Sequence, residues 1–146
     1  MKIDQYSYNC GIMDCFSEMV RARVKKLALA HPFKTQLERS RYLDFVEKIT
    51  KQYQINYYLD DDPLITDLFP YSLNRNTYNI IFYLDEKDIQ AYQKLKERKN
   101  IAIKNNQYHV LRKEIAYQFG YLLNYDDKTI AAYIKQNNEK EDDQGK

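Results

Sequence analysis

A chain of 146 residues is long enough to bury the core of one domain, and its 44% apolar and 30% charged residues exclude a disordered protein. A formal net charge of +2 gives only a weak field for attracting phosphate. The first ten residues contain no apolar signal segment, and the longest apolar run is far shorter than the ~20 residues that span a bilayer. We therefore expect a cytoplasmic protein with no membrane partner.

The first predicted element is a helix over residues 8–24, where apolar side chains recur at spacings of three and four. Cys10 and Cys15 lie five residues apart, which is about 140° around a helix axis. The two side chains therefore cannot readily form a disulfide or share a metal within the helix. We interpret both as free thiols, in keeping with a reducing compartment.

The sequence of residues 27–59 predicts a strand, a helix and a second strand. The apolar run at 27–30 stops at His31 and Pro32, as a buried strand would. Thr35 and Glu38 have the spacing of a capping box, which predicts a helix over about 36–53. Residues 55–59 (INYYL) are rich in strand formers, and this order predicts a right-handed parallel crossover.

Residues 63–77 form a connection whose conformation the sequence does not decide, because Leu64–Phe69 fits a short strand or a helical turn. Residues 78–84 (YNIIFYL) are the most hydrophobic run and predict the central strand. Asp85 has the character of a helix N-cap, and a loop rich in Lys and Asn is expected over 99–106.

Two further helices are predicted, one periodic from Tyr108 to Leu122 and a last one capped by Asp126 or Asp127. Gly120 costs its helix about 1 kcal/mol relative to Ala, and we expect close approach of another backbone to compensate.

The predicted fold is α/β, with a three-stranded or four-stranded sheet, mostly parallel or mixed, and about five helices in the order α-β-α-β-β-α-α-α. Residues 1–136 are expected to form a single domain, and the acidic, polar residues 137–146 a disordered tail.

Polar side chains follow both predicted parallel strands. His31 leaves the first, and Asp60, Asp61 and Asp62 leave the second, so all four would lie at the carboxyl edge of the sheet, where ligands bind in open α/β folds. An imidazole beside carboxylates could hold a divalent cation, and His31 and Asp61 could act as an acid and base pair. Both stretches are also good turn sequences that need no function.

Several kinds of site are not supported by the sequence. Its three glycines form no phosphate-binding loop, its cysteines and histidines match no zinc pattern, and no serine lies in a nucleophile elbow. We predict no cofactor, with a divalent cation as the alternative described above.

Tyrosine and positive charge are both abundant in parts of the chain. Fifteen tyrosines could stack on bases, although AT-rich codons give the same excess without selection for binding.

Residues 21–53 have nine basic against three acidic side chains, a pattern equally typical of a solvated helix face. The basic residues are Arg21, Arg23, Lys25, Lys26, Lys34, Arg39, Arg41, Lys48 and Lys51.

Three functional hypotheses follow. The first is a non-enzymatic binding or regulatory module that acts through tyrosine-rich contacts with a protein partner or a second copy of itself. The second is a metal-dependent hydrolase or phosphotransfer-type enzyme that uses His31 with Asp60, Asp61 and Asp62. The third is nucleic-acid binding through the basic segment 21–51, which the low net charge makes the least favoured.

Overall fold

The computed structural model describes residues 2–146, and these divide into two compact units. The first unit comprises residues 2–62 and 76–86, and the second comprises 63–75 and 87–146. Helices and a three-stranded sheet are both present, so the predicted α/β class is confirmed. In the described part of the chain, no helix has the length and apolar character needed to cross a membrane.

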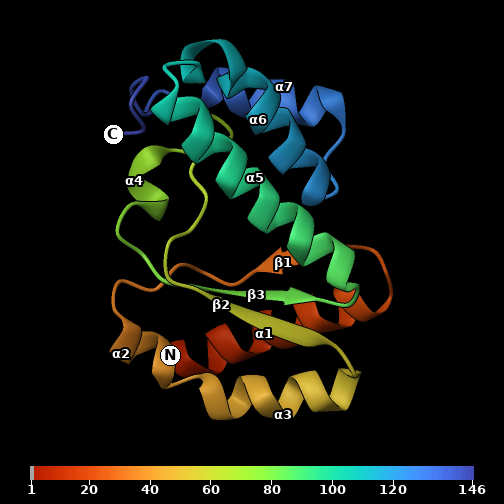
Figure 1. Ribbon diagram of the computed structural model, residues 1–146. Helices are drawn as coiled ribbons and strands as arrows, with labels where there is room; N and C mark the ends of the chain where they lie inside the picture. The colour runs from red at the N-terminus through yellow and green to blue at the C-terminus, as the bar shows by residue number, and fades with distance from the viewer. Residues whose placement is uncertain (1) are drawn as a thin grey trace. The chain divides into compact units, whose positions relative to one another are not determined.

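The first unit contains the sheet, whose strand order is β1-β3-β2 (Figure 1). Strand β3 is antiparallel to both of its neighbours. The elements of this unit are α1 (Gln5–Arg21), β1 (Leu27–Leu29), α2 (Gln36–Ser40), α3 (Leu43–Tyr53), β2 (Asn56–Asp60) and β3 (Asn79–Tyr83).

The prediction of a mostly parallel sheet was wrong. Strands β1 and β2 do point in the same direction, since both are antiparallel to β3, but β3 lies between them. Its residues Ile80, Ile81 and Phe82 are all 0% exposed, and a strand with no exposed apolar side chain belongs in the centre of a sheet. Because β3 lies between β1 and β2 and runs in the opposite direction, both ladders are antiparallel.

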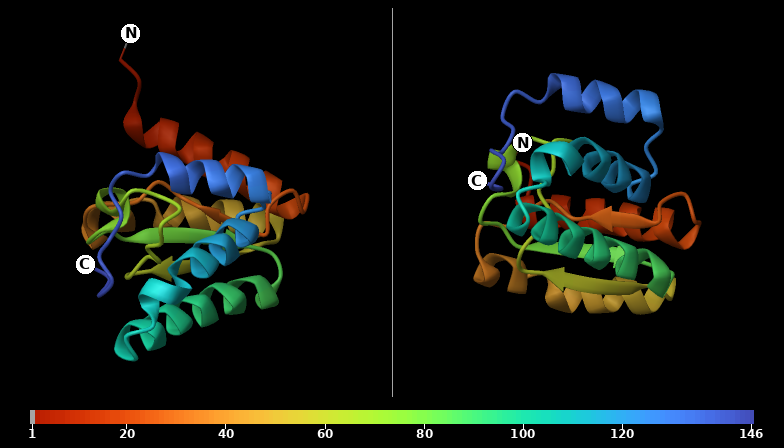
Figure 2. Two further views of the ribbon diagram at one scale, coloured as in Figure 1. Left: turned by 90° about the horizontal axis from the view of Figure 1, so that it is seen from above. Right: turned by 45° about the horizontal axis from the view of Figure 1, so that its top comes forward.

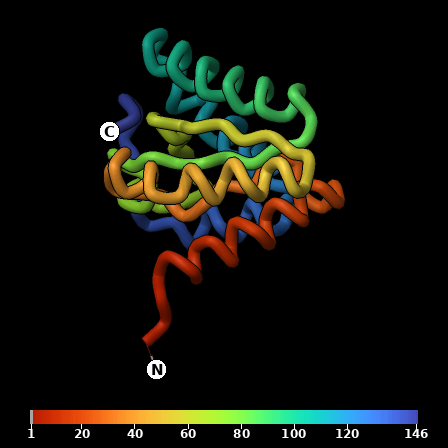
Figure 3. Tube along the Cα trace, turned by 90° about the horizontal axis from the view of Figure 1, so that it is seen from below, coloured from red at the N-terminus to blue at the C-terminus, as the bar shows by residue number. Residues whose placement is uncertain are grey.

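Helices α1 and α3 pack on the same face of the sheet (Figure 3). Met13 and Val20 of α1 meet Val46 of α3 over Ile80 and Phe82 of β3 in one buried cluster. This cluster is the core of the first unit, and it holds α1 against the end of β1.

The helix predicted over 8–24 is α1, which begins three residues earlier because Asp4, not predicted as a cap, accepts a hydrogen bond from the Tyr6 amide. Thr35 accepts a hydrogen bond from the Glu38 amide, as the capping box predicts. The single helix expected over 36–53 is instead α2 and α3, which are separated at residues 41–42.

The second unit is helical. It contains α4 (Tyr71–Asn74), α5 (Glu86–Lys104, of which Lys87 onward belongs here), α6 (Tyr108–Leu122) and α7 (Asp127–Gln136). The described residues thus form seven helices rather than about five, and α5 continues through most of the loop expected at 99–106. Helices α6 and α7 lie side by side (Figure 2).

Residues 137–146, expected to form a disordered tail, have specific contacts in this unit. Asn137 and Glu141 are each only 4% exposed, and the Glu139 carbonyl accepts a hydrogen bond from the Tyr71 amide at 2.8 Å. The segment carries no large apolar side chain, so its polar groups hold it in place.

Candidate functional site

The predicted site residues lie at one edge of the sheet. His31 follows β1, Asp60 ends β2, and these two ends face the same way because both strands are antiparallel to β3. His31 is exposed, whereas Asp60 is 1% exposed. Strand β3 separates them, so the topology brings the groups to one edge without making them neighbours in the sheet.

The aspartates of this edge have structural partners. Asp60 Oδ1 accepts a hydrogen bond from the Asp62 amide at 3.1 Å, and Asp61 Oδ1 lies 2.6 Å from Nη2 of Arg39. The same Arg39 donates through Nη1 to the carbonyls of Asp60 and Asn79, at 3.3 and 3.2 Å. These bonds fix the turn after β2, as the turn interpretation of the aspartate run expects.

Arg39 was missed as a member of this edge, although the sequence contains a signal for it. It lies three, seven and ten residues before Tyr42, Val46 and Ile49, which is the spacing of one helix face. A basic residue on an apolar face is buried only when it is paired, and Arg39 is 6% exposed.

Metal binding at this edge stays a prediction. Across residues 2–146, no three His, Cys, Asp or Glu side chains are grouped so as to hold a metal ion. A cation at Asp61 would have to displace the Arg39 guanidinium.

A small pocket lies where α1 covers the end of β1. It is a shallow hollow that opens to solvent and has room for about one water molecule. It is therefore far smaller than typical small-molecule sites, which enclose roughly 300–1,000 Å³. Its lining residues are Asn9, Ile12, Met13, Ala30, His31 and Phe33.

Two exposed tyrosines of α1 lie just before the lining residues of this pocket. Tyr8 lies one helical turn before Ile12 and is 54% exposed. Tyr6, 43% exposed, stacks on Tyr42 with ring centroids 4.8 Å apart, and the Tyr42 hydroxyl accepts a hydrogen bond from Asn9 at 2.9 Å. We call the surface formed by Tyr6, Tyr8, Asn9, Ile12 and His31 the pocket face.

Tyr6 of the pocket face and the neighbouring Cys10 are neutral near pH 7. A hydrogen bond with the Cys10 thiol raises the pKa of Tyr6, and burial raises the pKa of Cys10. Both groups therefore keep their protons. Cys10 is buried, Cys15 is exposed, and neither is in a disulfide, so the prediction of free thiols is confirmed.

The basic segment 21–51 is spread over several elements. Arg23 pairs with Asp85 at 2.7 Å, and Arg39 is buried with Asp61. Two of its nine basic groups are thus already paired with carboxylates, which weakens the case for a nucleic-acid footprint.

No protein-family model matches this chain, and neither a curated protein nor a solved structure shows significant similarity to it. Inference about its function therefore starts from its own surfaces.

Proposed function

We propose that the protein is a non-enzymatic protein-binding module and that its pocket face binds a second copy of the chain. The observation that carries this proposal is a small, mostly apolar hollow with the exposed ring of Tyr8 one helical turn from its lining residue Ile12. Four of the six lining residues, Ile12, Met13, Ala30 and Phe33, are apolar.

The exposed apolar side chains lie at the beginning of α1 or just before it. Ile3, just before α1, is 74% exposed, and Tyr8 is 54% exposed. A two-fold interface brings the same patch of each copy together, so the patch must be complementary to itself, and a hollow beside a protruding side chain is one way to achieve this. The pocket face provides both, with tyrosines of the kind that dominate binding energy at interfaces.

The test is sedimentation of the full chain over a concentration series reaching high micromolar values. We expect the average mass of the wild type to rise toward that of a dimer. Tyr8→Asp should stay monomeric, because it places a charge opposite an apolar pocket. Tyr8 lies in the first turn of α1, where an acidic side chain is compatible with the helix.

Val110→Asp is the matched control. Val110 is 63% exposed and lies in the first turn of α6, so the substitution adds the same charge at a similar helix position in the second unit. It should dimerise like the wild type. A wild type that stays monomeric throughout, or equal losses in the two variants, would contradict the proposal.

A further inference from the structure

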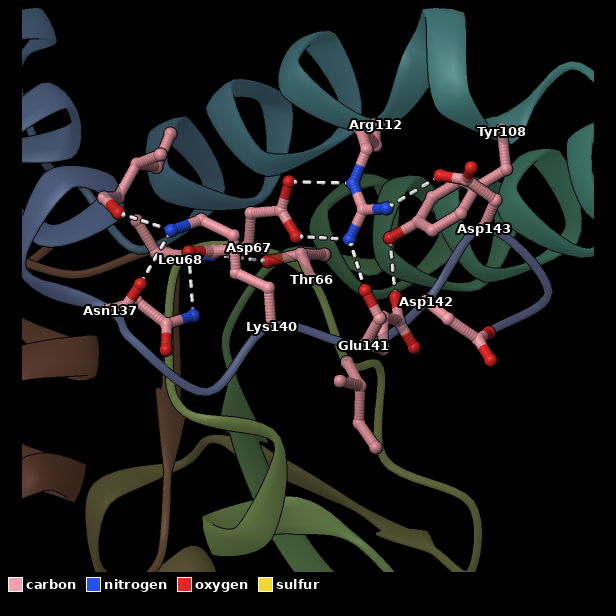
Figure 4. A network of polar contacts seen from close by, with 12 residues as sticks. Thr66, Asp67, Leu68, Tyr108, Arg112, Asn137, Lys140, Glu141, Asp142 and Asp143 are labelled. Carbon is pink, nitrogen blue, oxygen red and sulfur yellow. Dashed lines mark hydrogen bonds and ion pairs between the residues drawn. The ribbon is translucent and has the colours of Figure 1, made fainter. Parts of the chain in front are cut away.

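A second candidate site, independent of the pocket face, lies in the second unit around a buried carboxylate. Glu141 is 4% exposed, and its two carboxylate oxygens lie 2.8 and 2.9 Å from the Lys99 ammonium. The Tyr108 hydroxyl also donates to this carboxylate (Figure 4). Two donors from α5 and α6 thus enclose one carboxylate that comes from the segment 137–146.

Arg112 of α6 extends this recognition along the segment. Its Nη2 donates to the Glu141 carbonyl at 2.6 Å, and its Nη1 lies 2.9 Å from Asp143 Oδ1 (Figure 4). The three donors therefore contact a glutamate side chain, the backbone of that glutamate, and a carboxylate two residues further on. The pattern that they recognise is Glu-x-Asp.

The donors are also held by groups outside the segment. Lys99 donates to the Ile65 carbonyl at 2.7 Å, and Arg112 makes a two-point ion pair with Asp67 at 2.8 and 2.9 Å. Both cations lie over the Tyr108 ring, at 5.4 and 5.0 Å from its centroid. These contacts do not involve residues 137–146, so they hold Lys99 and Arg112 in position independently of the segment.

Polar contacts along the segment join it to the rest of the second unit. Besides the bonds of Glu141 and Asp143, Asn137 donates to the carbonyls of Asp67 and Phe69, both at 3.0 Å. Water can replace the contacts of the exposed Asp143 carboxylate, which therefore contribute little net free energy. The buried Lys99 ammonium, by contrast, requires another carboxylate in place of Glu141 if the segment leaves. The covalent link between the segment and α7 also favours the bound position, since it gives the segment a high effective concentration at the site.

We propose that Lys99, Tyr108 and Arg112 form a receptor for an acidic Glu-x-Asp peptide, which residues 137–146 occupy in cis. A partner protein that presents such a peptide binds by displacing this segment, and the segment acts as a built-in competitor. The charges of the receptor and the peptide are complementary, and the two rigid helices preorganise the donors.

The test uses a fluorescent peptide with the sequence NNEKEDDQGK and the full chain carrying Glu141→Gln and Asp143→Asn. These substitutions remove the competing carboxylates while leaving the three donors intact. Fluorescence anisotropy should show the peptide binding about tenfold or more tightly to this variant than to the wild type. The control peptide NNEKQDNQGK, with the same two changes, should lose that affinity.

The proposal is wrong if the variant retains wild-type circular dichroism and binds both peptides equally. Should the variant fail to fold, hydrogen exchange on the wild type gives the answer. Excess acidic peptide should speed exchange of the amides at 137–146, and the control peptide should not. Unchanged exchange with both peptides would also overturn the proposal.

Discussion

At the scale of single residues, Arg39 connects three parts of the first unit. It contacts the Asp60 carbonyl, the Asp61 carboxylate and the Asn79 carbonyl. These bonds connect α2 to the last residue of β2 and the first residue of β3. The aspartates that suggested a metal site are thus used to close a turn.

This arrangement predicts the response to divalent cations. We expect Mg²⁺, Mn²⁺ and Zn²⁺ to shift the unfolding temperature of the wild type no more than those of His31→Ala and Asp61→Ala. The reason is that a metal ion at Asp61 must compete with Arg39. A specific metal at 100 times its dissociation constant would stabilise the fold by about 2.7 kcal/mol. A shift of that size in the wild type, absent in both variants, would support the metal-dependent alternative.

Tyr53 gives a prediction about pH. Its hydroxyl donates to Asp14 of α1, and this hydrogen bond raises the pKa of Tyr53 to about 12 from its ordinary 10.0. A pKa raised on folding favours the native state below pH 10, and this contribution is lost as the pH rises from 10 through 12. The unfolding free energy of the wild type should therefore fall over that interval more than that of Tyr53→Phe.

Asp14→Asn provides the check on the cause. Without the carboxylate acceptor, the pKa of Tyr53 should move back toward 10.0, which ultraviolet difference titration of the tyrosines detects. If the wild type and Asp14→Asn titrate identically above pH 10, the bond to Asp14 does not shift this group.

At the scale of elements, two glycines give opposite predictions for the same substitution. A Cβ at Gly120 of α6 would lie 2.4 Å from Cγ1 of Ile130, a side chain of α7 that is 0% exposed. Close approach was expected here, but a side chain rather than a backbone makes it. A Cβ at Gly11 of α1 meets nothing within 4 Å.

Gly120→Ala should therefore destabilise the protein by about 1–3 kcal/mol through overpacking. Gly11→Ala should stabilise it by roughly 0.5–1 kcal/mol, because Ala is the better helix former. Urea unfolding of both variants measures the two effects. A neutral or stabilising Gly120→Ala would show that α6 and α7 are packed less closely than the structure indicates.

The elements themselves were predictable where a local signal specified them. The capping residues Thr35 and Asp126 and the apolar run of β3 were read correctly, because each depends on a few neighbouring residues. The division between α2 and α3 was not predicted, since the apolar spacing continues through it. The run of Lys and Asn after residue 98 suggested a loop, but it is helical as far as Lys104.

At the scale of the whole molecule, strand pairing and the position of residues 137–146 were beyond the sequence. The apolar character of β3 predicts that it is central but not its direction, which depends on how the chain returns to the sheet. The segment 137–146 has no apolar pattern, and Glu141 is buried because Lys99 and Tyr108, more than thirty residues away, surround its carboxylate. His31 was singled out from the sequence as a candidate metal ligand and acid–base group, and its position in the lining of a pocket was not predicted.

The proposed pocket face can be examined directly because the chain has only two histidines. His31 lines the pocket, and His109 is an exposed residue of α6 in the second unit. Proton NMR of the two imidazole rings over a dilution series therefore contains both the probe and an internal control. Binding of a second copy at the pocket face should shift the His31 resonances with concentration and leave those of His109 constant. Resonances of His31 that are independent of concentration, or equal shifts at both histidines, would contradict binding of a second copy at the pocket face.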